Sequence, residues 1–241
     1  MNTHKVRLDS LSKYLAQAGI ASRRKVVDLI KSKIVTVNGV MINEPGFKVG
    51  KGDLVKVRDT IVRSEQKIYL LLNKPKNCIT TVSDDFDRHN VLDLIPDRIK
   101  ERIYPVGRLD RNTTGLLVLT NDGDLAVKLS HPRYEIEKVY TVKLDKPFTR
   151  NHMRLLLEGV ELEDGVVVVD EARFLPDRPK NTLMLSLHSG KNRVVRRVFE
   201  KLGYDVQKLD RSFYAGFAKG GLDVGEWRHL TSTEVTLLKN L

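Results

Sequence analysis

The sequence has very little cysteine and no long apolar segment. Cys78 is the only cysteine among 241 residues, which excludes an internal disulfide framework and a multi-cysteine zinc site. No apolar run approaches the roughly 18 residues of a membrane-spanning helix, and residues 1–15 lack the apolar core of a signal peptide. These absences predict a protein of the cytoplasm that does not enter a membrane.

Sequence signatures of bound nucleotides and metals are also missing. Neither Gly-x-x-x-x-Gly-Lys-Ser/Thr nor Gly-x-Gly-x-x-Gly occurs, so the sequence gives no support for a nucleotide cofactor. The six histidines are scattered, without the short spacing of metal ligands. Asp84, Asp85 and Asp87 form an acidic cluster that suits Mg²⁺, but a solvated loop is the simpler explanation. We therefore expect neither a cofactor nor a metal.

Positive charge is plentiful and unevenly distributed. Lys and Arg number 42 against 31 Asp and Glu, which gives a net charge of +11. Residues 1–60 hold 12 basic and 5 acidic residues, so a quarter of the chain carries +7, whereas residues 61–241 carry only +4. This asymmetry indicates a basic module that contacts a polyanion, with an ordinary solvated basic face as the alternative.

Two short helices and a small sheet are predicted within the basic segment. Apolar residues recur at helical spacing before Gly19, which is suited to end a helix in the left-handed conformation. Ser22 is placed to cap a second helix. The first turn of that helix is rich in cations, which the helix dipole disfavours, and an external anion such as RNA phosphate would offset this cost. Asn38-Gly39 between alternating apolar residues predicts a β-hairpin.

This segment resembles the RNA-binding module of the small-subunit ribosomal protein four type, also called the alpha-L motif. The resemblance rests on residues 15–24 and 35–39 and covers about residues 5–60. It implies that the second helix and the adjoining loop bind structured RNA, and that the contacts include Arg23, Arg24 and Lys31. The expected organisation is an RNA-binding domain over residues 1–60, a linker over 61–66 and a larger domain over 67–241.

Beyond the linker, β-rich runs alternate irregularly with helical stretches. Thr231 and Glu234 form a capping box that predicts a final helix. Irregular alternation predicts an α+β domain with a mixed, mostly antiparallel sheet and flanking helices. The expected strands are Ile68–Leu72, Leu116–Thr120, Val139–Leu144, Val166–Val169 and Leu183–Leu187, and the expected helices are Leu125–Leu129, Thr149–Leu157 and Asn192–Leu202.

One candidate for chemistry is Asp110, in a polar, turn-prone stretch that leads directly into an apolar strand. A carboxylate on a loop anchored by a core strand is held rigidly, and the flanking Arg108 and Arg111 would keep it ionised. An ordinary ion pair or a turn-forming aspartate is the competing interpretation.

A second candidate is the basic stretch that follows Gly190. Arg193, Arg196 and Arg197 are three and four residues apart, so we expect them to share one side of a helix near its start. Cations again crowd a helix N-terminus, where a carboxylate or phosphate partner would stabilise them. A merely solvated face is the alternative.

Taken together, these stretches resemble the ribosomal RNA pseudouridine synthases that carry the same N-terminal module. The resemblance implies that Asp110 is the catalytic aspartate, Tyr140 the active-site aromatic residue and Arg196 the cation paired with the aspartate. Arg108, Lys191 and Arg193 are further expected RNA contacts. The motifs that carry the resemblance are Gly107–Asp110, Thr114–Gly123, Glu137–Tyr140 and Gly190–Arg197.

The resemblance also has a departure and a preference within the family. Val194 stands where the family usually has a polar residue such as Gln, which puts a secondary contact in question but not Asp110. His131-Pro132 and residues 159–165 look most like the large-subunit type B enzymes. Ribosomal RNA is therefore the expected partner, within ribosome-assembly intermediates.

Pseudouridine formation fits the sequence because it exchanges no electrons or phosphates and so requires no cofactor. An ionised carboxylate is needed at the ribose of a flipped-out uridine, either to attack the anomeric carbon or to remove the neighbouring proton. The sequence leaves both routes open. It also leaves open a small-subunit target, a non-catalytic ribosome-assembly factor, and a metal-dependent RNA hydrolase that uses the acidic cluster at residues 84–87.

Overall fold

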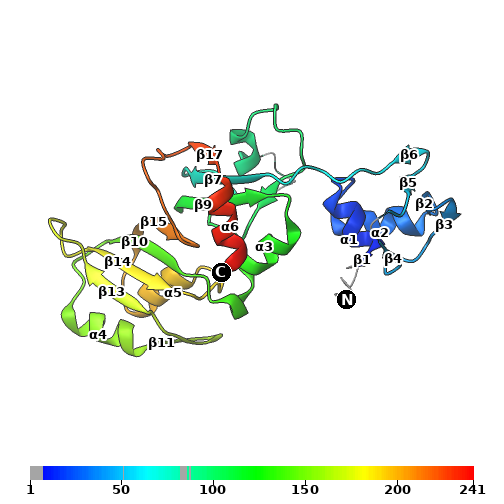
Figure 1. Cartoon of the computed structure of the whole chain (residues 1–241). Helices are drawn as coiled ribbons and strands as arrows, with labels where there is room; N and C mark the ends of the chain where they lie inside the picture. Colours follow the sequence, from blue (N-terminus) through cyan, green and yellow to red (C-terminus); the bar gives the residue numbers. More distant parts are fainter. Residues whose placement is uncertain (1–7, 51, 82–85, 87) are drawn as a thin grey trace, which may run out of the picture. The chain divides into compact units, whose positions relative to one another are not determined.

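The chain folds into two compact units, which are described separately below. The computed structural model describes residues 8–50, 52–81, 86 and 88–241. One unit comprises residues 1–67 with 100–102, and the other comprises residues 68–99 and 103–241 (Figure 1). The acidic cluster of Asp84, Asp85 and Asp87 lies outside the described residues.

The first unit combines two short helices with short β-strands. Helix α1 spans Leu11–Gln17 and helix α2 spans Arg23–Lys31. Four strands form a sheet in the order β3-β2-β5-β6, and β1 pairs with β4. The strands are β1 (Asp9–Ser10), β2 (Val35–Val37), β3 (Val40–Met41), β4 (Lys48–Val49), β5 (Val55–Val57) and β6 (Thr60–Ile61).

Local signals in the sequence account for the turns of this unit. The Ser22 hydroxyl accepts a hydrogen bond from the backbone of α2, and Gly19 has a positive φ of 76° directly after α1, as predicted. Asn38 and Gly39 both have positive φ in the turn between β2 and β3, which confirms the hairpin. The apolar faces of the two helices meet the inner side of the strands, and one core results, built from Leu11, Leu15, Val26, Ile30, Val35, Val49 and Val55.

The second unit is built on one large, mixed and mostly antiparallel sheet, which confirms the α+β prediction. Its central path runs β13-β14-β10-β15-β9-β7-β17, and only the pair β9 and β15 is parallel. The strands on this path are β7 (Tyr69–Lys74), β9 (Thr114–Thr120), β10 (Lys138–Leu144), β13 (Glu171–Phe174), β14 (Thr182–Leu187), β15 (Val206–Tyr214) and β17 (Trp227–His229).

Helices and short strands complete this unit. The capping box of Thr231 and Glu234 is present at the start of the last helix, as predicted. The helices are η1 (Val91–Leu94), α3 (Gly123–Ser130), η2 (Pro132–Tyr134), α4 (Arg150–Glu158), α5 (Val194–Lys201) and α6 (Ser232–Asn240). The remaining strands are β8 (Tyr104–Pro105), β11 (Val160–Leu162), β12 (Gly165–Val167) and β16 (Phe217–Ala218).

One strand prediction needs correction, and one strand was not predicted. The run Val166–Val169 is not a strand of the main sheet, because its first half forms β12, which pairs only with β11 in a separate hairpin. Strand β15 was not predicted, although its nine residues lie at the centre of the sheet between β10 and β9. Charged residues interrupt its apolar pattern, and the pairing with two neighbouring strands stabilises it nonetheless.

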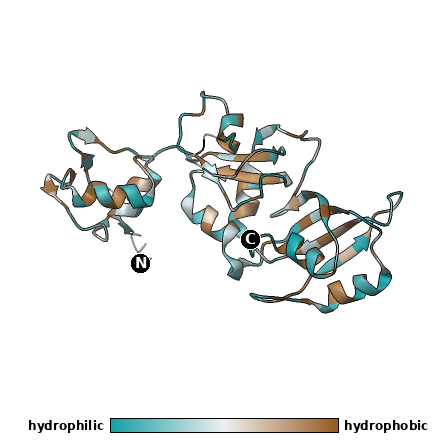
Figure 2. Cartoon of the chain, turned by 180° about the vertical axis from the view of Figure 1, so that it is seen from behind, coloured by the Kyte–Doolittle hydropathy of each residue, from teal (hydrophilic) through white to brown (hydrophobic). Residues whose placement is uncertain are grey.

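The sheet buries both of its faces, and this explains its apolar strands. Along β7, Leu70 and Leu72 belong to one core cluster, whereas Tyr69 and Leu71 belong to the other. The first cluster includes residues of α4 and α5, and the second includes residues of α3 and α6. Figure 2 accordingly shows the central strands as hydrophobic. Within the part of the chain that the structure describes, no helix combines the length and apolarity needed to cross a membrane.

Candidate active site

Asp110 lies on the loop between β8 and β9, and its backbone is held on both sides. Before it, the buried Leu109 exchanges two hydrogen bonds with Thr80, through its amide at 3.3 Å and its carbonyl at 2.9 Å. After it, the Thr113 amide donates to the Asp110 carbonyl at 3.0 Å. The loop is therefore clamped, while the Asp110 side chain stays 30% exposed at the cavity. The expected rigid carboxylate is present.

Lys74 holds the loop of Asp110 through hydrogen bonds to backbone carbonyls. This role of Lys74 was not predicted from the sequence. Its side chain is fully buried at the end of β7, and the ammonium donates to the carbonyls of Pro75, Cys78 and Arg111 at 2.9, 2.6 and 3.3 Å. Burial lowers the pKa of Lys74 to about 8. The one sequence signal was a lysine that directly ends an apolar strand before a proline.

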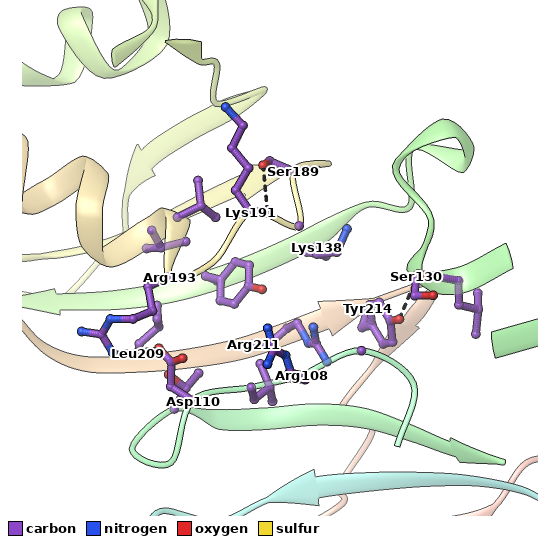
Figure 3. A pocket seen from close by; sticks show the side chains of 18 residues that line it. Arg108, Asp110, Ser130, Lys138, Ser189, Lys191, Arg193, Leu209, Arg211 and Tyr214 are labelled. Atoms are coloured by element: carbon purple, nitrogen blue, oxygen red, sulfur yellow. Dashed lines mark hydrogen bonds and ion pairs between the residues drawn. The ribbon is translucent and has the colours of Figure 1, made fainter. Parts of the chain in front are cut away.

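Two arginines of one segment contact the Asp110 carboxylate, and Figure 3 shows one of them, Arg193, beside Asp110. Arg193 Nη1 lies 3.3 Å and Arg196 Nε 3.6 Å from Asp110 Oδ2. Arg196 is the more buried side chain, 16% exposed against 51% for Arg193, and its Nη1 is anchored on the Val206 carbonyl at 2.8 Å. Burial, the dominant cause, lowers the pKa of Arg196 from its usual value, and the Asp110 charge opposes that shift.

The expectation for the arginine cluster was therefore only partly correct. Arg193 adopts a left-handed conformation just before α5, which turns it with Arg196 toward Asp110. Arg197 lies elsewhere and forms two 2.9 Å hydrogen bonds with Asp164, which Lys191 also contacts. The three arginines are thus paired with the carboxylates of Asp110 and Asp164, as expected for cations near a helix N-terminus. Among the described residues, however, Asp110 takes its ion pairs from α5 and its N-cap rather than from the flanking Arg108 and Arg111.

A cavity of about 140 Å³ adjoins Asp110 and is bounded by the central strands. Tyr140 on β10 lines it and is only 8% exposed. Arg211 stands directly opposite Tyr140 on the neighbouring strand β15. An aromatic wall next to a carboxylate that contacts two arginines suits a flat base attached to a sugar.

The cavity also contains groups that the sequence analysis did not single out. Thr113 lines it and is 2% exposed, and its hydroxyl has no hydrogen-bond partner among the described residues. Lys138 and Arg211 also line this cavity. Lys138 lies within the Glu137–Tyr140 motif but had no expected role there, and Arg211 lies in none of the motifs, because the sheet register brings it to the cavity.

The other predicted RNA contacts are distributed over both units. Arg108 is exposed on the rim of the cavity, and Lys191 lines the same cavity. In the first unit, Arg23 and Arg24 begin α2 and Lys31 ends it, and all three side chains are exposed. As for metals, no cluster of three His, Cys, Asp or Glu with metal-site geometry occurs among the residues that the structure describes.

Comparison with known proteins agrees with this architecture. Residues 68–201 match the family model of RNA pseudouridylate synthases, and residues 10–55 match that of the S4 domain. The ribosomal large subunit pseudouridine synthase B of Bacillus subtilis (strain 168) is 44% identical over 237 residues, which cover 97% of each chain. A dual-specificity RNA pseudouridine synthase of Escherichia coli (strain K12) is 35% identical over 232 residues, covering 93% of this chain and 76% of the relative.

A solved fold supports the same assignment. A crystal structure of a pseudouridylate synthase superposes with a TM-score of 0.67 at 27% identity and covers 95% of this chain and 99% of that chain. Fold, site and sequence therefore define an enzyme that acts on RNA. The chain belongs to the RNA pseudouridylate synthase family and is an RNA pseudouridine synthase with an S4 domain.

Proposed function

We propose that this enzyme converts a specific uridine of ribosomal RNA, in the large subunit, to pseudouridine. The observation that carries the proposal is the Asp110 carboxylate, held between Arg193 and Arg196 at a cavity walled by Tyr140. The 44% identity to a large-subunit type B enzyme favours the large-subunit target. A small-subunit target is the alternative that the test below distinguishes.

The residues act on a uridine that has left the base stack. The C1′–N1 bond breaks, the base turns, and a bond from C1′ to C5 replaces it. Asp110 either attacks C1′ or removes the C2′ proton, and both routes need the ionised carboxylate that Arg196 stabilises. Tyr140 supplies a surface on which the detached base stays, and its hydroxyl assists loss of the C5 proton.

The two units divide the work between binding and chemistry. Residues 1–60 form the RNA-binding domain, residues 61–66 the linker and residues 67–241 the catalytic domain. The domain of residues 1–60 binds RNA through the exposed cations of α2, and the catalytic domain adds Arg108, Lys191 and Arg193. The substrate is the ribosomal RNA of assembly intermediates, which places the enzyme in the cytoplasm.

The decisive variant is Asp110→Asn, which keeps the shape of the side chain and removes its charge. We expect turnover to be abolished and RNA affinity to change by no more than about threefold, because the carboxylate is needed for chemistry rather than binding. Asp164→Asn is the matched control, since it neutralises another arginine-paired aspartate that does not line the cavity. It should keep wild-type turnover.

Mapping of pseudouridines identifies the target. Carbodiimide modification of both ribosomal RNAs, from cells with and without the gene, should reveal one large-subunit position that only the wild-type gene and the Asp164→Asn gene restore. If the pseudouridine that is lost without the gene lies in small-subunit RNA, the small-subunit target is correct and the large-subunit target is wrong. Identical maps, or substantial turnover by Asp110→Asn, would refute the proposal.

A further inference from the structure

Arg211 is the most deeply buried cation of the cavity. Its side chain is 3% exposed, its Nε donates to the Leu116 carbonyl at 2.8 Å, and its guanidinium lies 4.1 Å from the centre of the Tyr214 ring. Tyr214 is itself fixed, because its hydroxyl donates to the Leu129 carbonyl at 3.2 Å. Arg211 is thus a positioned group rather than a mobile surface arginine.

The charge of Arg211 has no counterion within the part of the chain that the structure describes. Among the described residues no carboxylate forms an ion pair with it, and its buried Nη2 has no hydrogen-bond partner. A buried charge without a partner costs several kcal/mol, so it is retained only where it serves a purpose. Since Arg211 lines the cavity, the missing partner is most simply an anionic group that enters with the substrate.

A second cation reinforces this positive compartment. Lys138 donates to the carbonyls of Ile136 and His188 at 2.6 and 2.9 Å and lines the same cavity. Burial, the larger cause, and the positive charge of Arg211 together lower the pKa of Lys138 to about 8, against the opposing charge of Asp170. Two neighbouring cations that disfavour one another are a favourable environment for negative charge.

The sheet register aims Arg211 at the position where the base lies. Arg211 stands directly opposite Tyr140 across β10 and β15, and opposite Gly115 across β15 and β9. A Cβ at Gly115 would come within 2.3 Å of the Arg211 carbonyl oxygen, so glycine permits this close strand approach. A base that lies against Tyr140 therefore has an edge toward the Arg211 side chain on the neighbouring strand.

We infer that Arg211 is a further catalytic residue, which binds an anionic carbonyl oxygen of the uracil ring while that ring is detached from the ribose. When the C1′–N1 bond breaks, its electron pair stays on the ring and spreads to the carbonyl oxygens. Fixed donors in a dry cavity stabilise such a developing charge more strongly than water does. This inference rests on the proposed function and assigns the leaving group its electrostatic partner.

The depth of Arg211 favours the base over an RNA phosphate as the source of the negative charge. A phosphate stays on the backbone near the cavity mouth, where Arg108 and Arg193 are exposed, whereas Arg211 is almost inaccessible to solvent. The two sources also predict different effects on binding. Loss of a phosphate contact flattens the salt dependence of RNA affinity, and loss of a contact with the detached base does not.

The test compares Arg211→Met with wild type in single-turnover reactions on target RNA containing uridine or 5-fluorouridine. The readout is the rate at which the C1′–N1 bond breaks, measured by digestion and mass spectrometry of nucleosides. Fluorine withdraws electrons and stabilises the detached base by itself. We expect Arg211→Met to slow uridine cleavage by about 100-fold, as removal of one oxyanion donor does, and to slow 5-fluorouridine cleavage much less.

Two further variants keep the outcome interpretable. Arg154→Met removes an exposed arginine of α4 and should leave both rates unchanged. Arg211→Lys keeps the charge but loses the fork of donors, so it should show the same substrate dependence with a smaller loss. If Arg211→Met does not fold, Arg211→Lys decides the comparison.

The outcomes separate this inference from the proposed function. If the wild-type enzyme converts no uridine in the target RNA, the proposed function itself is wrong. With an active wild type, equal losses on both substrates would show that Arg211 is only structural. A flattened salt dependence of RNA affinity in Arg211→Met would assign the site to phosphate and overturn the assignment to the base.

Discussion

The two units of this enzyme place positive charge in opposite environments. In the first unit, Arg23, Arg24 and Lys31 are exposed on one short helix. In the second, Lys74 and Arg211 are almost entirely buried. The first unit concentrates charge where solvent and salt reach it, and the second surrounds individual cations with carbonyl groups and aromatic rings.

This difference indicates what each set of cations contributes. Charges in water interact weakly and are screened beyond about 8 Å at physiological salt, so exposed cations act through counterion release on a polyanion. Buried cations are hardly screened and are held in one geometry, so we expect them to position loops and to stabilise charge during the reaction. Substitutions of the buried cations of the second unit should therefore alter folding and rate, and substitutions of the exposed cations on α2 should alter salt-dependent affinity.

The largest effect on folding stability is expected from Lys74→Met. Methionine fills a similar volume but leaves the carbonyls of Pro75, Cys78 and Arg111 without their donor. We expect a loss of about 2 kcal/mol in unfolding free energy, because buried acceptors are left unpaired. Turnover should fall as well, since the loop that carries Asp110 loses its support. Urea denaturation and single-turnover kinetics measure the two effects, and Lys76→Met, an exposed lysine two residues away, is the control.

The destabilisation caused by Lys74→Met should depend on pH in a direction that the pKa of Lys74 determines. The pKa of Lys74 falls from 10.5 in the unfolded chain to about 8 in the folded protein, so the unfolded state binds more protons between these values. The Lys74 contribution to stability therefore increases as pH rises from about 8 to 10.5. The destabilisation by Lys74→Met should be larger at pH 10 than at pH 7. A loss that shrinks over this range would contradict the burial of a charged Lys74.

The next effect compares two arginines that contact the same carboxylate. Arg196 is 16% exposed and anchored on Val206, whereas Arg193 is 51% exposed. If burial decides the contribution, Arg196→Lys should slow single turnover by about tenfold or more, and Arg193→Lys by no more than about threefold, because an exposed ion pair contributes little. If Arg196→Lys and Arg193→Lys lose the same factor in single-turnover rate, burial of the arginine does not decide its contribution to the rate.

The sequence was informative wherever a local signal decides the structure. The Ser22 cap, the Asn38-Gly39 turn and the Thr231 capping box each act within a few residues and were predicted. The α+β class follows from the irregular alternation of strands and helices. Asp110 was identifiable because a turn-prone stretch adjoins an apolar strand, although its roles in catalysis remain predictions.

The remaining parts depend on contacts between distant segments. Lys74 and Arg211 look like ordinary charged residues in the sequence, and only the packed sheet removes them from water. Likewise, the arginines that contact Asp110 lie more than eighty residues away, and the left-handed Arg193 redirects them in a way that helical spacing does not predict. Strand β15 was missed for the same reason, because its stability comes from neighbours on both sides.

The smallest effect on chemistry is expected from the exposed cations of the first unit. Simultaneous Arg23→Gln, Arg24→Gln and Lys31→Gln substitutions should weaken RNA binding while leaving the single-turnover rate at saturating RNA unchanged. Each lost phosphate contact reduces the log–log salt slope by roughly 0.7 for single-stranded RNA, so three contacts flatten it by about 2. Salt titrations of affinity on one RNA fragment measure this slope.

A second triple variant tests whether position or total charge is responsible. Lys48, Arg58 and Arg63 are also exposed in the first unit but lie outside α2, so changing all three to Gln removes the same charge. If α2 forms the RNA contact, this control should flatten the slope by well under one unit, because it removes no phosphate contact and changes only the screened long-range field. Equal slopes in the two triple variants would show that the first unit acts through its net charge rather than through a defined helical surface.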